Sequence, residues 1–283
     1  KKKNNTTMKI SASEVNNLRK STGAGMMDCK NALVEANGDF DKAIDVLRKK
    51  GQKVASKRAD REATEGVVLA KVSANCKFGT LISINCETDF VAKNQDFIAL
   101  TNQILDLAIE GGVNNIEDLK QMKINELSVE EKLLEQTGVI GEKIELGFYA
   151  SIEDELVSAY THHGNRLASI AGLNIYNSDF IEAGKDVCMQ IAAMNPLGVN
   201  ESDISKDVLD KELEIAKDLA KKEGKPEQMI EKIALGRLGK FFKENTLMKQ
   251  TFIKDNKKSI ESYLKDKNTD LTVNQFKRFG LSN

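Results

Sequence analysis

The sequence predicts an α+β fold in which a small helical domain precedes a core of two similar antiparallel-sheet-plus-helix subdomains with an inserted helical hairpin. Apolar side chains recur at helical spacing up to residue 51, and from residue 66 they give way to alternating, β-branched runs. Residues 205–243 return to helical spacing with a coiled-coil-like pattern. The length of 283 residues favours about two domains.

Three short helices are expected in residues 9–51, the first predicted domain. Ser11 is followed three residues later by glutamate, which is the spacing of a capping box. A second helix is expected to begin near Met26, after a Gly-Ala-Gly break, and Asp39 is placed to cap a third that Gly51 ends. A unit this small has a thin core, so we expect it to be a partner-docking domain.

The segments on either side of this domain lack the pattern of a folded core. Residues 1–8 open with the polar run KKKNNTT, which predicts a disordered extension or an expression remnant. Residues 52–65 are charged and contain no aromatic side chain, which is typical of a linker or a solvated helical connector.

The first core subdomain is predicted over residues 66–143. The runs VVLAKVS and TLISINC are rich in β-branched residues and flank a short polar segment, which indicates a β-hairpin. The run QDFIALTNQILDLAIE then has the broad apolar stripe of a buried helix. Ser128 opens a further capping box and a short helix that is expected to reach Gln136.

The second core subdomain is predicted over residues 144–283. Three strand-like runs, IELGFYASI, ELVSAYTHH and NRLASIAGLNIYN, precede another helix. Residues 205–243 are expected to form an αα-hairpin whose turn contains Gly224 and Pro226. A helix near 257–266 and the run LTVNQFKRF close the chain, and this last strand is expected to rejoin the second sheet.

The two core subdomains share a similar strand-to-helix junction. With a shift of 90 residues, the stretch Thr88-Asp89-Phe90-Val91 lies on Ser178-Asp179-Phe180-Ile181. A duplicated half-domain explains this match, and so does the chance recurrence of a polar cap followed by an apolar residue.

Composition argues against several classes of function. The net charge is −1, and the densest basic stretch, residues 48–61, lacks aromatic side chains for stacking on bases, so a solvated helix face explains it better than direct nucleic-acid binding. The four cysteines show no CxxC spacing and are interpreted as free thiols, so no metal site or cofactor is expected. No run approaches the ~18–20 apolar residues of a membrane span.

An enzymatic function has little support in the sequence. The Gly-Ala-Gly segment lacks the preceding strand and third glycine of a dinucleotide loop, and no phosphate-binding GxxxxGK[ST] occurs. A hydrolase that uses His162 or His163 as a general base remains a hypothesis, although no nucleophile stands at a spacing that implicates either. A structural or interface histidine is the simpler interpretation.

Apolar side chains also occur where a solvated turn is expected. Met26 and Met27 follow a glycine-rich loop, and Phe90 and Val91 lie beside Asp89 at the strand-to-helix junction. Leaving a phenylalanine exposed forgoes about 1.5–3 kcal/mol of burial, which a partner protein can recover. The alternative is that Phe90 packs back under its own sheet, and periodicity does not decide between the two.

Two long runs identify a family. TGAGMMDCKNALVEANGDFDKAI (residues 22–44) and CETDFVAKN (residues 86–94) resemble the bacterial elongation factor Ts family, the nucleotide exchange factors of the GTPase elongation factor Tu. The hairpin turn at Gly224-Lys225-Pro226 and the run EKIALGRLGKFF are also similar. The resemblance extends over residues 9–280 and weakens past Phe242.

The resemblance implies a ubiquitin-associated-like N-terminal domain, a coiled-coil hairpin that contacts the partner, and a site for elongation factor Tu. The implied partner-binding residues are Arg19, Met26, Met27, Thr88, Asp89, Phe90, Val91 and His162, with His163 as the alternative to His162. It implies a cytoplasmic factor that releases GDP by disturbing the partner's magnesium-phosphate site, without chemical catalysis or a cofactor of its own. GDP and GTP then bind the partner. The alternative is a non-catalytic interaction adaptor that uses the small helical domain.

Overall fold

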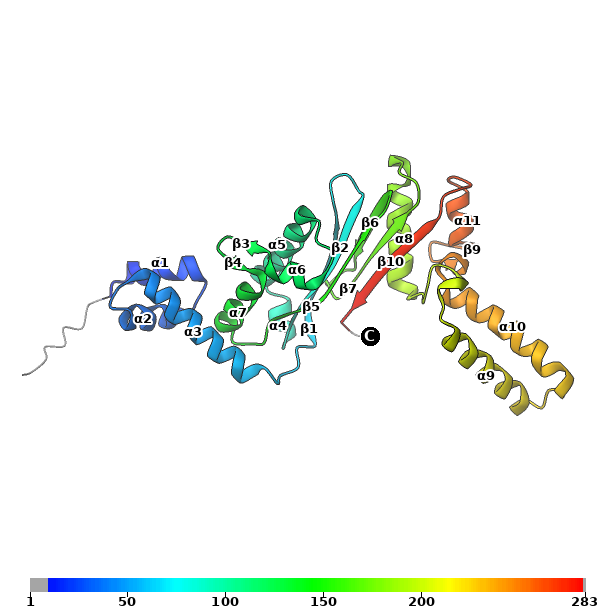
Figure 1. Ribbon diagram of the computed structural model, residues 1–283, viewed down its shortest axis with the longest axis horizontal. Helices are drawn as coiled ribbons and strands as arrows, with labels where there is room; N and C mark the ends of the chain where they lie inside the picture. Colours follow the sequence, from blue (N-terminus) through cyan, green and yellow to red (C-terminus); the bar gives the residue numbers. More distant parts are fainter. Residues whose placement is uncertain (1–9, 282–283) are drawn as a thin grey trace, which may run out of the picture. The chain divides into compact units, whose positions relative to one another are not determined.

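The computed structural model describes residues 10–281, and it confirms the predicted α+β class (Figure 1). The expectation for residues 1–8 lies outside the described residues. The chain divides into two compact units, each described by itself below. Within the described chain, the first holds residues 10–67, Ile82–Leu107 and Asn115–Tyr149, and the second holds Val68–Leu81, Ala108–Asn114 and residues 150–281.

The N-terminal part of the first unit consists of α1 (Ala12–Thr22), α2 (Met26–Glu35) and α3 (Phe40–Arg58), drawn in blue in Figure 1. The predicted caps are confirmed, because Ser11 forms a capping box with Glu14 and the Asp39 side chain accepts from the Lys42 amide. A small apolar core holds the helices together, and it includes Val15, Leu18, Cys29, Leu33 and Ala43.

Helix α3 does not end at Gly51, and that prediction is wrong. The helix continues for seven further residues to Arg58, so the first half of the expected linker is helical. Gly51 instead marks a close approach to α7 (Val129–Ile140): a Cβ atom added at Gly138 would lie 2.5 Å from the Gly51 Cα. Glycine is needed here for contact between two helix backbones rather than as a helix stop.

The first sheet has the strand order β1 (Glu65–Val72), β2 (Phe78–Cys86) and β5 (Glu145–Glu153). The predicted hairpin of β1 and β2 is present. Strand β5 is hydrogen-bonded to β2, although the sequence pattern groups it with the strands that follow. The choice of neighbour in a sheet is a long-range property that strand periodicity does not encode.

Six helices and strands lie between β2 and β5 in the sequence, and the first five precede α7. These five are α4 (Asp89–Ala92), α5 (Gln95–Gly111), α6 (Ile116–Gln121), and the pair β3 (Lys123–Ile124) and β4 (Leu127–Ser128). Helix α7 then begins with the predicted capping box of Ser128 and Glu131. It runs past the predicted end at Gln136 and stops at Gly141, whose φ of 83° is the left-handed conformation typical of a C-cap.

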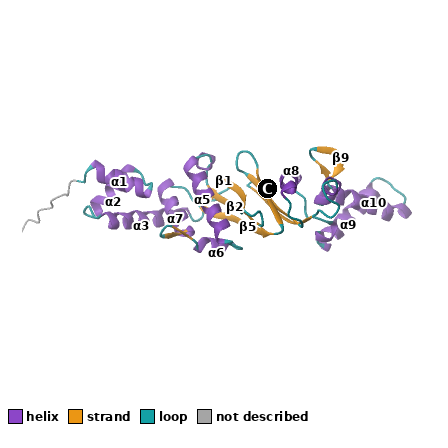
Figure 2. Ribbon diagram, turned by 90° about the horizontal axis from the view of Figure 1, so that it is seen from above, coloured by secondary structure: helices purple, strands orange, loops and turns teal. Residues whose placement is uncertain are grey.

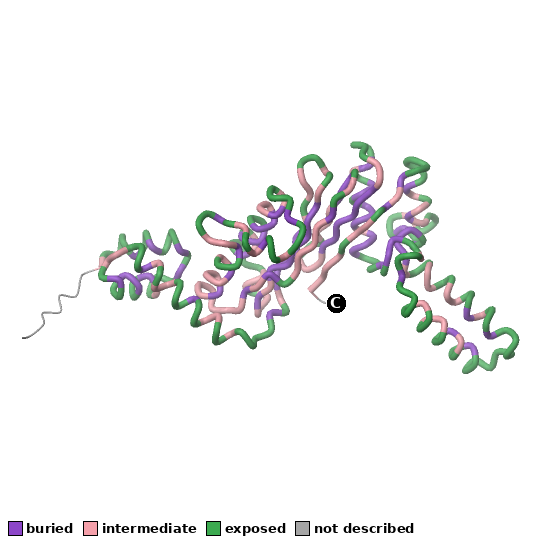
Figure 3. The backbone as a smooth tube through the Cα atoms, in the orientation of Figure 1, coloured by how far each residue is buried: buried purple, intermediate pink, exposed green. Residues whose placement is uncertain are grey.

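The second unit is built on the antiparallel sheet β10-β7-β6, with β6 at Leu156–Thr161, β7 at Leu167–Leu173 and β10 at Val273–Gly280. The last strand therefore rejoins this sheet, as predicted. Helix α8 (Ile181–Met194) packs on β6 and β7 after the 3₁₀ turn Ser178–Phe180. The core between them includes Leu156, Leu173, Phe180, Val187 and Ile191, and Figure 3 shows the burial along these elements.

The predicted αα-hairpin consists of α9 (Lys206–Lys222) and α10 (Glu227–Asn245), which pack against each other. Both helices are visible in Figure 2, and most of their residues are coloured as exposed in Figure 3. Gly224 adopts a φ of 71° in the turn, and Pro226 directly precedes α10, as the sequence predicts. Ion pairs join the two helices, with Lys217 Nζ 2.8 Å from Glu231 and Arg237 Nη2 2.7 Å from Glu223.

The remaining elements of the second unit are short, and all but the 3₁₀ turn Glu201–Asp203, which precedes the hairpin, lie between the hairpin and β10 in the sequence. They are the 3₁₀ turns Glu201–Asp203 and Leu247–Lys249, the pair β8 (Thr251–Phe252) and β9 (Asp255–Ser259), and α11 (Ile260–Lys265). Asp186 of α8 accepts hydrogen bonds from Lys254 Nζ at 2.5 Å and from the Tyr263 hydroxyl at 2.6 Å, which ties these elements to α8. Over the described residues, no helix combines the length and the apolar character needed to cross a membrane.

Candidate functional site

The junction between β2 and α5 presents Phe90 to solvent. Strand β2 ends at Cys86, and the four-residue helix α4 begins three residues later. The Phe90 side chain is 83% exposed, the highest value among the large apolar residues that are exposed in the described chain, and no residue of α4 is buried. Phe90 therefore does not pack under its own sheet, and an apolar ring on a turn without core contacts is a candidate partner contact.

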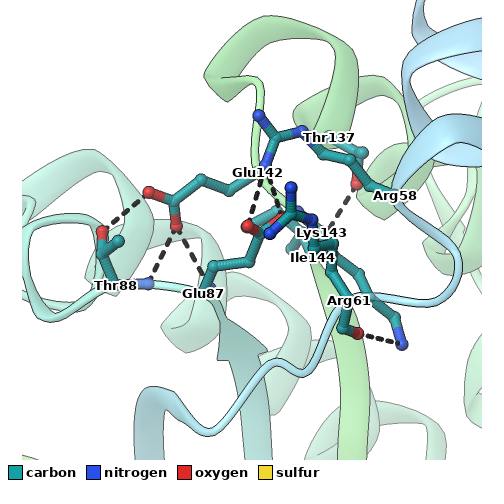
Figure 4. A network of polar contacts seen from close by, with 8 residues as sticks. All are labelled: Arg58, Arg61, Glu87, Thr88, Thr137, Glu142, Lys143 and Ile144. Atoms are coloured by element: carbon teal, nitrogen blue, oxygen red, sulfur yellow. Dashed lines mark hydrogen bonds and ion pairs between the residues drawn. The ribbon is translucent and has the colours of Figure 1, made fainter.

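Glu142 holds the backbone that leads into this turn. Its Oε2 accepts from the amides of Glu87 and Thr88 at 3.1 and 3.0 Å, and its Oε1 accepts from the Thr88 hydroxyl at 2.7 Å (Figure 4). Thr88 is the N-cap residue of α4, but its side chain forms no capping hydrogen bond, and its hydroxyl donates to Glu142.

Glu87 faces the end of α3 and the α7–β5 turn. Arg58 Nη1 donates to both carboxylate oxygens at 2.8 Å, and the Lys143 amide donates to Oε1 at 2.6 Å (Figure 4). These donors lower the pKa of Glu87, with the Lys143 amide as the main cause and the Arg58 guanidinium as a further one. Lys143 in turn donates from Nζ to the Arg61 carbonyl at 3.2 Å, so the same turn also holds the segment that follows α3.

Asp89 and Val91 complete the predicted motif. Asp89 Oδ2 lies 2.6 Å from Lys93 Nζ, one helical turn further on, and this hydrogen bond is the main cause of its lowered pKa. Both side chains of this pair are open to water, so the carboxylate remains charged and reachable. Val91 is half-buried.

The N-terminal helices present a second exposed apolar group. Met26 and Met27 begin α2 and are 60% and 63% exposed, and Arg19 is exposed on α1. A groove of about 660 Å³ in the first unit is lined by Gly23, which lies three residues before Met26, and by Val91, the neighbour of Phe90. The structure thus brings the Met26 and Phe90 segments to the borders of one groove.

His162 and His163 belong to the second unit, in the turn between β6 and β7, and both are exposed. His162 Nδ1 lies 2.9 Å from the Tyr160 hydroxyl, and the two rings are tilted with centroids 5.9 Å apart. Among residues 10–281 no three His, Cys, Asp or Glu side chains are grouped as a metal site requires, and all four cysteines are free thiols.

The sequence is similar to those of known proteins. The model of the family described as "Elongation factor TS" matches residues 87–283, which is more than half of the chain. The chain belongs to the elongation factor Ts family. It is 53% identical to the elongation factor Ts of Christiangramia forsetii over 273 residues, which cover 96% of this chain and 99% of that protein. The elongation factor Ts proteins of Flavobacterium psychrophilum and Amoebophilus asiaticus are 48% and 50% identical over 272 residues, with 96% of this chain and 98% of each relative covered.

Membership of the elongation factor Ts family confirms the resemblance found from the sequence and makes this chain a translation elongation factor. Sequence reasoning singled out Thr88, Asp89 and Phe90 but missed Glu142, which holds their backbone. Glu142 lies 54 residues from Thr88, directly after the glycine that ends α7, and no local pattern marks it. Arg58 was missed because it lies in the segment that was interpreted as a linker or a solvated helical connector.

Proposed function

We propose that this chain is a guanine-nucleotide exchange factor that binds elongation factor Tu and promotes the release of GDP. The observation that carries the proposal is Phe90, a phenylalanine that is 83% exposed on a turn with no buried residue and has the charged Asp89 beside it. Such a ring gains burial only on contact with another molecule.

The proposed mechanism needs no chemical step on this chain and no cofactor. A P-loop GTPase holds its nucleotide through backbone amides, a lysine and Mg²⁺. Insertion of Phe90, with Asp89 beside it, displaces partner elements around the metal and phosphate loop, and loss of the ion removes a large positive charge from the phosphates. Each loss of about 1.4 kcal/mol in nucleotide binding weakens it tenfold.

Linkage makes the effect reciprocal. If this chain weakens the partner's hold on nucleotide by some factor, nucleotide weakens the hold on this chain by the same factor. The complex is therefore a transient intermediate that either GDP or GTP dissociates, and their concentrations set the direction. Translation in the cytoplasm is the proposed setting.

The remaining predicted residues form the proposed contact surface. Arg19, Met26 and Met27 dock on the nucleotide domain of the partner, Thr88 and Val91 flank the inserted ring, and His162 and the α9–α10 hairpin supply further contacts. The exposure of Met26 and Met27, and the groove that borders both apolar segments, support this assignment.

The test uses elongation factor Tu loaded with a fluorescent GDP and catalytic amounts of this chain. We expect faster GDP release, and we expect Phe90→Ala to slow it strongly without unfolding the protein. An unchanged release rate on addition of the wild-type chain refutes the proposal. If the chain binds elongation factor Tu through Met26 and Met27 but never accelerates release, the adaptor hypothesis is favoured.

A further inference from the structure

The turn that presents Phe90 lies outside the apolar core, with Phe90 exposed and Val91 and Ala92 half-buried. None of the residues of α4 is buried, and four residues are too few for a stable isolated helix. The polar contacts at the start of the turn therefore contribute to the position of the Phe90 ring. Those contacts come from two carboxylates, Glu142 and Glu87, which we call the carboxylate brace.

Glu142 supplies the direct contacts of the brace. Its carboxylate accepts from two consecutive amides and from the Thr88 hydroxyl, all within 3.1 Å, so the three donors converge on one group. Hydrogen bonds to an ionised acceptor are about twice as strong as neutral ones. The geometry fixes the backbone at Glu87 and Thr88, the two residues directly before α4.

Glu87 connects the same backbone to the N-terminal helices. Its side chain accepts from Arg58, the last residue of α3, and from the amide next to Glu142 (Figure 4). Helix α3 begins at Phe40 in the N-terminal domain, so one continuous helix runs from that domain to the brace. The brace therefore joins three segments that are distant in sequence: the end of α3, the end of β2 and the α7–β5 turn.

We propose that Glu142 is a positioning residue for nucleotide exchange, which holds the Phe90 turn in its binding geometry before the partner arrives. This inference rests on the proposed exchange function. Ordering a loop residue costs backbone entropy, and a turn that is already ordered avoids that loss on binding. Glu142 itself need not touch the partner.

The test compares Glu142→Ala and Glu142→Gln with Glu126→Ala in the full-length chain. Glu126 is an exposed glutamate in the β3–β4 turn of the same unit and serves as the matched control. The Gln variant keeps the shape and one amide acceptor oxygen, so it preserves part of the contact. The release rate of fluorescent GDP from elongation factor Tu is measured over a range of factor concentrations.

We expect Glu142→Ala to lower the maximal release rate about tenfold, the factor that corresponds to about 1.4 kcal/mol, while the half-saturating concentration changes much less. Glu142→Ala leaves the docking residues Met26 and Met27 unchanged, whereas the Phe90 ring is no longer fixed in its binding geometry. Glu142→Gln should fall between wild type and Glu142→Ala, and Glu126→Ala should match wild type. A general loss of folded protein would instead lower the active fraction, which circular dichroism detects.

Hydrogen–deuterium exchange of the free chain gives a readout that needs no partner. In Glu142→Ala the amides of Glu87 and Thr88 lose their acceptor, so the peptide that contains them should exchange at least tenfold faster, while the core of the second unit is unchanged. An unchanged maximal release rate in Glu142→Ala, with Phe90→Ala still slow, overturns the positioning role and leaves the proposed function standing. If the wild-type chain itself has no effect on release, the proposed function fails, and unchanged deuterium uptake in Glu142→Ala overturns the brace.

Discussion

Phe90 and Phe180 occupy corresponding positions at two strand-to-helix junctions, yet Phe90 is 83% exposed and Phe180 is 6% exposed. Phe180 lies in the core of the second unit with Val187 and Ile191, whereas the turn of Phe90 contributes nothing to a core. Both junctions share a short pattern, a polar residue followed by Asp-Phe and a β-branched residue. The phenylalanine of this pattern packs in the core at Phe180 and is exposed to solvent at Phe90.

This contrast predicts that the same substitution, phenylalanine to alanine, lowers the free energy of unfolding much more at one position than at the other. Phe180→Ala removes a buried ring and should lower the free energy of unfolding by about 3–5 kcal/mol, whereas Phe90→Ala should change it by less than about 0.5 kcal/mol. Urea unfolding monitored by circular dichroism measures both. A Phe90→Ala variant as unstable as Phe180→Ala would mean that the Phe90 ring packs within its own chain.

Local sequence signals predicted most of the elements. Ser11, Asp39 and Ser128 cap helices where the sequence places caps, and Gly224 lies in the predicted turn of the hairpin. Each of these signals acts within about four residues, the range over which capping and turn chemistry operate.

The features that the sequence did not reveal depend on contacts between distant segments. Gly51 has the local signature of a helix stop, and only its contact with Gly138 explains why the helix continues through it. Glu142 has no local signature at all, since its donors lie 54 and 55 residues away. The exposed state of Phe90 was equally undecided, because its periodicity fits a buried or a displayed ring.

The contact of Gly51 with Gly138 gives a prediction about helix packing. Gly138→Ala places a methyl group 2.5 Å from the Gly51 Cα, and backbone cannot move aside as a side chain can, so we expect a loss of about 1–3 kcal/mol in unfolding free energy. Gly236 is a matched control, because it lies within α10 with no atom within 4 Å of an added Cβ. Gly236→Ala should raise helix stability by about 0.5–1 kcal/mol.

Thermal unfolding of both glycine variants measures this difference. An increase in stability on Gly138→Ala would show that α3 and α7 do not approach as closely as the structure has them. Equal changes in stability at Gly138 and Gly236 would show that helix propensity alone determines the effect of both substitutions.

Glu87 predicts a dependence of stability on pH. Its pKa is lowered in the folded chain, so its contribution is fully present above the unfolded pKa near 4.5 and is lost as the pH falls through the lower folded value. Glu87→Gln should therefore be less stable than wild type at pH 7, and the difference should shrink below about pH 4.5. Unfolding midpoints between pH 7 and pH 3 measure it, with Glu126→Gln as the control. A gap that stays constant down to pH 3 would contradict a charged, hydrogen-bonded Glu87.

The rate at which each cysteine thiol reacts should report how readily the Phe90 turn opens. Cys29, Cys86 and Cys188 are buried, whereas Cys76 is half-buried in the turn after β1. The Cys86 thiol donates to the Thr88 carbonyl at 3.2 Å, and burial, with the negative charge of Glu142 as a smaller cause, raises its pKa to about 12. Because the thiolate is the reactive form, Cys86 should react far more slowly than a free thiol at pH 8.

Native chain treated with a maleimide at pH 8 should therefore label rapidly at Cys76 alone, and Cys76→Ser should remove that fast phase. All four thiols should react in denaturant. In Glu142→Ala the Thr88 carbonyl loses its fixed position and the neighbouring negative charge disappears, so Cys86 should label faster than in wild type. Rapid labelling of Cys86 in the native wild-type chain would contradict a closed turn, because the thiol is reached only when the segment between β2 and α4 moves away.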